Sequence, residues 1–209
     1  MTAAALILFV AYLFGAFIVR TGLHVRRTGD SGWRGISGRP GTPEWWAGVG
    51  FAAALVAGLL GPVTAMAGLE PLQLFHAPLI QWASAVLAVI GIATTFITQA
   101  AMGDNWRIGV DETEATTLVT SGPFALVRNP IFTAMAMTGA GLAFMVPNVV
   151  ALIGLALLLI ALELQVRIVE EPHLRRAHGP AYAQYEATVG RFLPRVGRSS
   201  SGATEKVVC

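Results

Sequence analysis

The sequence predicts an all-α, polytopic membrane protein with five transmembrane helices, the last two forming a helical hairpin that precedes a cytoplasmic helical segment. Three observations lead to this fold class. Of the 209 residues, 55% are hydrophobic and only 12% are charged, and the mean hydropathy is +0.64, which is outside what a soluble globular chain needs. Apolar segments close to the length of one bilayer crossing recur along the chain. The basic residues fall between these segments in an alternating pattern.

Five apolar segments account for the predicted transmembrane helices. About 20 apolar residues cross the roughly 30 Å hydrocarbon layer as a helix, and four of the segments meet or approach that length. The fourth segment is shorter, and at about 1.5 Å per residue it reaches only roughly 24 Å. It runs into Pro147 and Asn148, a turn signal, so we predict a tight hairpin with the fifth segment. The predicted spans are about 3–19, 45–69, 79–102, 131–146 and 149–166.

The fourteen Lys and Arg residues predict the orientation of the chain. Every one lies in a segment that five alternating spans put on the same side, whereas the opposite segments, 70–78 and 147–148, carry none. The positive-inside rule then places the N-terminus outside and the C-terminus in the cytoplasm. We expect the host membrane to be a bacterial-type plasma membrane. Residues 1–19 have no basic region ahead of the apolar stretch, so we do not expect a cleaved signal peptide.

The remaining segments predict a single membrane-embedded domain, residues 1–196, and a flexible tail, residues 197–209. Segment 20–44 is rich in Gly and Arg and is typical of an irregular loop. Segment 168–194 is typical of an interrupted amphipathic helix. The basic residues form no patch interleaved with aromatic side chains, so we expect no nucleic-acid partner. The single cysteine, Cys209, excludes a disulfide framework within the chain.

Arg128, Asn129 and Pro130 stand directly before the fourth span. Asn is a favoured N-cap and Pro a favoured first helical residue, so these residues could simply start a helix at the membrane surface, with Arg128 facing lipid phosphates. The same residues support a second interpretation. The unpaired N–H groups and the positive dipole end of this helix, beside Arg128, would hold a carboxylate or a phosphate. The two interpretations do not exclude each other.

An ionic stripe is predicted at the end of the fifth span. Glu163, Arg167, Glu170 and Glu171 occupy positions i, i+4, i+7 and i+8, which lie along one face of an α-helix. A charged group deep in a bilayer costs about 2.5–3.5 kcal/mol on insertion scales and normally faces a partner or a wet cavity. Arg167 is the expected partner of both Glu163 and Glu171. The stripe is either an interfacial salt-bridge ladder or part of a functional site.

The segments on either side of the hairpin resemble the isoprenylcysteine carboxyl methyltransferase family and its relatives, the phospholipid N-methyltransferases. "LVTSGPFALVRNPIF" precedes the hairpin, and "RIVEEPHLRRAHGPAYAQYEATVGRFLP" follows it. The positions that fit the family pattern are Gly122, Pro123, Arg128, Pro130, Arg167, Glu170, Glu171, Leu174, Gly179, Tyr182, Tyr185 and Pro194. The family's His is Asn129 here, and two of its tyrosines are Phe124 and Phe132, so one imidazole and two hydroxyls are missing from the motif.

The resemblance implies an integral membrane methyltransferase that uses S-adenosyl-L-methionine without a Rossmann domain. It implies a lipophilic acceptor that enters from the membrane lipids and offers an oxygen, nitrogen or sulfur atom. It also implies that the cofactor lies between the hairpin and the cytoplasmic regions, about 103–130 and 167–196, and that Arg167 and Glu171 are at the transfer site. The cofactor-binding residues that it implies are Gly122, Pro123, Val127, Arg128, Asn129, Pro130, Glu170, His178, Tyr182 and Tyr185.

Two other functions stay open on the sequence. Some membrane reductases that use NADPH on unsaturated isoprenoids or sterols share a similar C-terminal helical arrangement, and a non-enzymatic membrane module is the third possibility. Glu163 alone, without polar residues in the middle of the other spans, makes a poor conduction path for a permease. Metal binding is not predicted, because His173 and His178 are five residues apart and share no helical face.

Overall fold

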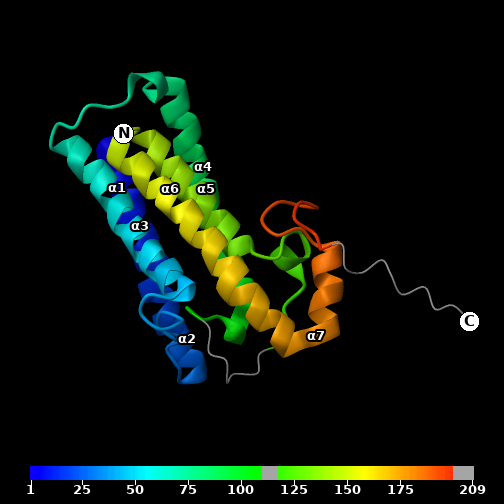
Figure 1. The fold of residues 1–209 in the computed structure, drawn as a ribbon. Coiled ribbons are helices and arrows are strands. Elements are labelled where there is room, and N and C mark those ends of the chain that lie inside the picture. The colour runs from blue at the N-terminus through cyan, green and yellow to red at the C-terminus, as the bar shows by residue number, and fades with distance from the viewer. Residues whose placement is uncertain (110–116, 200–209) are drawn as a thin grey trace, which may run out of the picture.

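Helices make up the fold in the computed structural model, which describes residues 1–109 and 117–199 (Figure 1). These residues contain no β-strand, only two isolated bridges, between Trp33 and Ile108 and between Val127 and Gly190. The long helices run side by side as a bundle, and the helix labelled α7 leaves the bundle at one end. The all-α prediction is therefore confirmed for the described part of the chain.

In the described part of the chain, four helices are long and apolar enough to cross a membrane. They are Thr2–Thr28, Pro43–Met66, Pro78–Asn105 and Val149–Thr188, the last by its apolar first part. The fifth apolar helix, α5 (Pro130–Met145), has only 16 residues, in line with the short fourth span of the prediction. Large apolar side chains such as Ile7 and Leu79 point outward and are 67% and 81% exposed, as expected for helices surrounded by lipid. A count of five crossings stays a prediction.

The first helix is longer than predicted. α1 (Thr2–Leu13) continues through a π-helical segment, Phe14–Val19, into α2 (Arg20–Thr28). It stops only at Gly29, whose φ of 76° is left-handed. The predicted irregular loop 20–44 is thus wrong for its first nine residues. Gly29 can end the helix in this way because glycine adopts the left-handed C-cap conformation without steric cost.

The next two helices both begin at a proline, which matches the helix-start signal in the sequence. α3 (Pro43–Met66) follows Thr42, whose side-chain oxygen accepts a hydrogen bond from the backbone N–H of Trp45 at 3.4 Å. α4 (Pro78–Met102) has proline in the same first position. Proline at this position carries no N–H to leave unsatisfied. Both helices begin one or two residues before the predicted spans.

The predicted hairpin is formed by α5 and α6 (Val149–Leu164). Asn148, which is completely buried, closes the turn between them. Its side-chain oxygen accepts a hydrogen bond from the backbone N–H of Ala151 at 2.9 Å, and its amide donates to the carbonyl of Gly61 at 2.8 Å. One side chain therefore caps α6 and ties the hairpin to α3.

Glycines allow the hairpin to pack closely on the other helices. α5 packs mainly against α4, and α6 mainly against α3. A Cβ added at Gly141 would lie 2.5 Å from the backbone nitrogen of Ala88, and one added at Gly91 would lie 2.6 Å from that of Thr138. Such distances admit only glycine, and small residues at crossing points are the usual means by which membrane helices approach.

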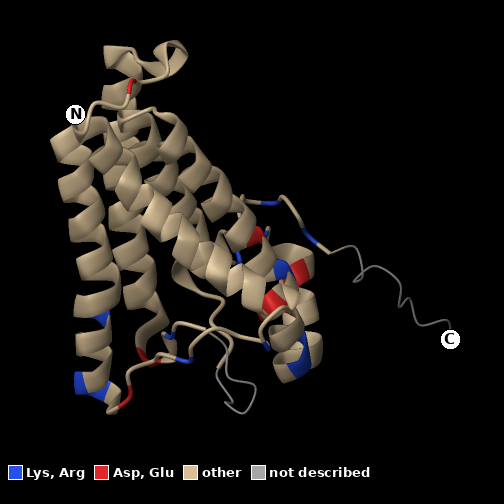
Figure 2. Ribbon diagram, turned by 60° about the vertical axis from the view of Figure 1, so that its left-hand side comes forward, with Lys and Arg blue, Asp and Glu red and all other residues tan. Residues whose placement is uncertain are grey.

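The chain leaves the bundle after a second π-helical segment, Gln165–Glu170, and continues as α7 (Glu171–Thr188). α7 is interrupted at Gly179, where φ is 49°, directly before Pro180, so the predicted interruption is confirmed. Figure 2 shows that the described Lys and Arg residues gather toward the end of the bundle where α2 and α7 lie. This distribution agrees with the positive-inside argument, although the orientation itself stays a prediction.

The predicted tail, 197–209, does not start where we expected. The backbone N–H of Ser199 donates to the carbonyl of Glu186 at 3.1 Å, and the carbonyl of Gly197 accepts from Arg128 at 3.2 Å. Residues 197–199 are thus fastened to the body of the protein. The rest of the predicted tail, with Cys209, lies outside the described residues.

Candidate active site

Glu171 is the centre of a buried ionic network at the start of α7. Arg128 Nη2 donates to Glu171 Oε1 at 2.8 Å. Arg191 holds the same carboxylate with two hydrogen bonds, from Nε at 2.6 Å and from Nη2 at 2.8 Å. Arg175 Nη2 lies 3.5 Å from Oε2. The side chains of Arg128 and Glu171 are only 2% and 3% exposed, so this pair is fully withdrawn from water.

Glu186 is the second carboxylate of the network. It accepts from Arg175 Nε at 3.0 Å and from Arg175 Nη2 at 2.8 Å. Its Oε1 lies 3.9 Å from Arg128 Nη2. Three guanidinium groups therefore face two carboxylates, and the charge of Glu171 and its hydrogen bonds raise the pKa of Arg191 above its ordinary value.

The backbone brings these residues together across a wide sequence separation. The N–H of Arg128 donates to the carbonyl of Gly190 at 2.8 Å, and that of Asn129 donates to the carbonyl of Arg191 at 3.1 Å. The short segment before α5 thus pairs with the segment after α7. Arg128 Nη1 also donates to the carbonyl of Glu186 at 3.0 Å.

Arg167 does not pair with Glu171, and this part of the prediction was wrong. Arg167 forms an ion pair with Glu163, which confirms the other predicted pairing. Both side chains are well exposed, 56% and 40%. The physical reason is the π-helical segment Gln165–Glu170, which has a wider turn than an α-helix and so rotates all following residues away from the expected stripe.

Arg128 does not face lipid phosphates either, because its side chain is buried against Glu171. The second interpretation of this junction is closer to the structure, except that the carboxylate beside Arg128 belongs to the protein itself. Asn129 occupies the N-cap position of α5, but its side chain makes no capping hydrogen bond. Its amide instead donates to the carbonyl of Arg191 at 3.2 Å.

The two predicted tyrosines join α7 to the turn before α5. Tyr185 donates its hydroxyl to the carbonyl of Phe124 at 2.6 Å. Tyr182 is 1% exposed, and its ring lies 6.1 Å from that of Tyr185. Gly122 and Pro123 open the short 3₁₀ turn Gly122–Ala125, where Gly122 has a φ of 60°. The Tyr185 hydroxyl therefore joins this turn to α7.

Two nitrogen atoms of the predicted cofactor set are buried without a hydrogen-bond partner in the described residues: Arg128 Nε and His178 Nε2. Glu170, at the end of the π-helical segment, is partly exposed. Buried polar atoms are normally hydrogen-bonded, so each of these two atoms could take a partner from a bound molecule. No group of three or more His, Cys, Asp or Glu side chains in residues 1–109 and 117–199 could hold a metal ion.

Sequence reasoning missed Arg175, Glu186 and Arg191. Arg175 could have been found, because it stands four residues after Glu171 on a helix. Arg191 reaches Glu171, and Glu186 reaches Arg128, only because the chain folds back after α7. No local spacing in the sequence predicts these contacts.

Comparison with known proteins agrees with the motifs. Residues 79–181 match the family model described as phospholipid methyltransferase. The chain is also similar to the nickel-cobalt-cadmium resistance protein NccN of Alcaligenes xylosoxydans xylosoxydans, with 28% identity over 124 residues. That alignment covers 59% of this chain and 57% of NccN, so the chain spans little more than half the length of this relative. No solved structure matches the chain.

The segment that matches the family holds α4, the hairpin and Glu171. The apolar helices and this match together indicate an integral membrane protein. Residues 79–181, about half of the chain, thus match the phospholipid methyltransferase family, as the motifs predicted.

Proposed function

We propose that this protein transfers a methyl group from S-adenosyl-L-methionine to a lipophilic acceptor delivered by the membrane, at the cytoplasmic face. The observation that carries the proposal is the pair of buried, unpartnered nitrogens, Arg128 Nε and His178 Nε2, within the predicted cofactor set. Leaving such an atom unsatisfied costs about 1–3 kcal/mol. A cofactor with a carboxylate and purine nitrogens offers hydrogen-bonding partners for atoms of both kinds.

The charge of the site favours the same ligand. The network carries a net charge of one positive unit, because three arginines, Arg128, Arg175 and Arg191, face two glutamates, Glu171 and Glu186. Arg175 is the guanidinium that a ligand can reach, because its side chain is 50% exposed. Arginine is well suited to hold a carboxylate with two hydrogen bonds. These residues fit the amino-acid end of the cofactor.

Methyl transfer requires no covalent bond between the protein and the reactants. When bound, S-adenosyl-L-methionine supplies a methyl group on a positively charged sulfur. The residues around it accelerate transfer by aligning the acceptor atom and keeping water out. Glu171 acts here as a positioning residue, since its two oxygens are occupied by arginines and hold Arg128 and Arg191 in place.

Arg167 keeps its proposed place at the transfer site, but without Glu171 as its partner. Its ion pair with Glu163 is exposed, and exposed pairs contribute only about 0–1 kcal/mol. The guanidinium can therefore leave Glu163 at little cost. It would then orient a carboxylate or phosphate of the acceptor at the membrane surface.

Isothermal titration calorimetry on the protein in detergent tests the proposal. We expect saturable binding of S-adenosylhomocysteine, and His178→Ala should weaken this binding. His76→Ala is the control and should leave it unchanged, because His76 lies at the opposite end of the bundle. Incubation of native membranes with labelled cofactor should then yield a labelled lipid product. Heat with NADPH and none with S-adenosylhomocysteine would support the reductase and contradict the proposal.

A further inference from the structure

The C-terminal loop, residues 190–199, follows α7 and turns back beside the start of α5 (Figure 1). Its backbone is held by hydrogen bonds. The carbonyl of Phe192 accepts from Thr133 Oγ1 at 2.9 Å, and the N–H of Arg191 donates to the carbonyl of Val196 at 2.8 Å. A Cβ added at Gly190 would lie only 2.1 Å from a carbonyl oxygen of the same loop. The loop is therefore a tight turn that is fixed to α5.

The side chains of this loop are exposed although its backbone is held. Leu193 is 58% exposed and Val196 is 59% exposed. Leu126, in the turn before α5, is 66% exposed. It lies beside the loop, because its neighbour Val127 forms an isolated bridge with Gly190. Leu126, Leu193 and Val196 thus form an apolar patch around the C-terminal loop.

Two exposed arginines, Arg195 and Arg198, lie in the same loop. Neither forms an ion pair with a described residue. Arg195 has a φ of 68° and is the only described residue other than glycine with a positive φ. A side chain makes this conformation sterically costly, and such costs are often found where a residue has a function. The loop therefore presents two unpaired positive charges next to the apolar patch.

The packing of α5 on α4 gives the level of the loop along the bundle. The two helices run in opposite directions, and Gly91 of α4 faces the stretch 134–138 of α5. Thr133, which is bonded to the loop, stands three residues before the middle of this stretch. It is therefore level with about Thr94, three residues after Gly91. α4 continues for eight more residues to Met102, or about 12 Å. The loop thus lies alongside the apolar helix and not beyond its end.

Lipid is the medium that the structure offers at this level. The exposed side chains of α4 on either side of this level are apolar, with Ile90 48% and Ile97 62% exposed. Exposed leucine and valine fit the same medium, but a charged group there needs a partner. Arginines near the interface extend their long side chains toward the headgroups. A guanidinium binds a phosphate with two charge-assisted hydrogen bonds.

We propose that the C-terminal loop is a binding site for an anionic phospholipid in the leaflet next to α7. The apolar patch contacts the acyl chains, and Arg195 and Arg198 hold the phosphate. An anionic lipid is preferred because a zwitterionic headgroup carries its own cation beside the phosphate. The inference goes beyond the proposed function and does not depend on it, since this lipid is a ligand of the loop and not a methyl acceptor. Because Arg191 of the same loop holds Glu171, the bound lipid would also fix the ionic network at the membrane surface.

Fluorescence quenching in lipid nanodiscs tests the site. A bimane fluorophore is attached to Val196→Cys in a Cys209→Ser background, since Val196 is exposed. The quenchers are doxyl-labelled phosphatidylglycerol and doxyl-labelled phosphatidylcholine. One arginine near an anionic surface favours binding about fivefold, so we expect half-quenching at a roughly three- to tenfold lower fraction of the phosphatidylglycerol. No quenching by either lipid would show that the loop faces water, and equal quenching would show no phosphate selection. Either result would overturn the proposal.

A pair of double variants shows whether the two arginines cause the preference. Arg195→Gln with Arg198→Gln should abolish the preference for phosphatidylglycerol and leave quenching by phosphatidylcholine unchanged. Arg26→Gln with Arg27→Gln is the matched control, because it removes the same charge from two exposed arginines at the end of α2, and it should keep the preference. An equal effect of both double variants would indicate a general charge effect and contradict a site at the loop. Relief of quenching by excess inorganic phosphate would identify a soluble anion as the ligand and refute the lipid.

Discussion

Glu171→Ala is the substitution whose effect the structure determines most directly. The change leaves Arg128, with a side chain only 2% exposed, without its 2.8 Å hydrogen bond to a carboxylate. It also removes both hydrogen bonds that Arg191 makes to Glu171. Breaking a buried ion pair by removing one partner costs about 3–5 kcal/mol. Typical total stabilities are about 5–15 kcal/mol, so the loss is a large part of the whole.

Glu163→Ala is the matched control for this experiment. Glu163 also pairs with an arginine four residues away, but both side chains are exposed, and such a pair contributes about 0–1 kcal/mol. For a chain of this size about 1 kcal/mol shifts the melting temperature by about 2–4 °C. We therefore expect the melting temperature of Glu171→Ala in detergent to be about 6–20 °C below that of the wild type. The melting temperature of Glu163→Ala should lie within about 4 °C of the wild type. Tryptophan fluorescence measures both. Equal melting temperatures for the two variants would refute the idea that Glu171 holds the site together.

Three further predictions follow from single contacts. Arg167→Ala should abolish transfer of labelled methyl groups to lipids while leaving the melting temperature within about 4 °C, because only an exposed ion pair is lost; retained turnover would remove Arg167 from the transfer site. His178→Ala should weaken S-adenosylhomocysteine binding about three- to tenfold in calorimetry, the usual effect of one hydrogen bond, and unchanged affinity would show that the buried Nε2 atom does not face the cofactor. Asn148→Ala should destabilise the protein by about 1–2 kcal/mol, since it removes a helix cap and the bond to Gly61, and an unaltered melting curve would contradict this role.

The sequence predicted the bundle well, because the information for it is local. The predicted spans about 79–102, 131–146 and 149–166 begin within one residue of α4, α5 and α6. Hydropathy sums over neighbouring residues, and prolines and caps mark helix starts within one turn. Neither signal depends on what the helix packs against. The same reasoning failed at α2, where the helix continues past the apolar run, since hydropathy reports the membrane boundary and not the helix boundary.

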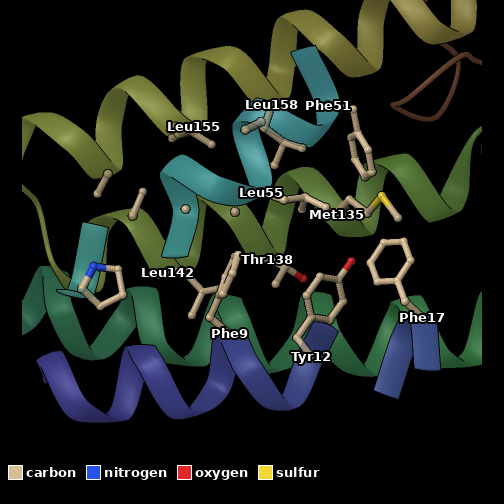
Figure 3. Close-up of a pocket in the computed structure, with 17 residues that line it drawn as sticks. Phe9, Tyr12, Phe17, Phe51, Leu55, Met135, Thr138, Leu142, Leu155 and Leu158 are labelled. Atoms are coloured by element: carbon tan, nitrogen blue, oxygen red, sulfur yellow. The ribbon is translucent and has the colours of Figure 1, made fainter. Parts of the chain in front are cut away.

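The sequence by itself determined that apolar helices cross a membrane and that Arg128, Glu171 and the tyrosines of α7 belong to one motif. Only the tertiary structure decided which of these groups touch. The π-helical segment Gln165–Glu170 turned Glu171 away from Arg167, and the chain after α7 brought Arg191 to it. An apolar cavity lined by Phe9 and Tyr12 (Figure 3) likewise arises from small residues on α3, α5 and α6. Contacts between distant segments depend on helix rotation and close packing, and a difference of one residue per turn is enough to exchange one partner for another.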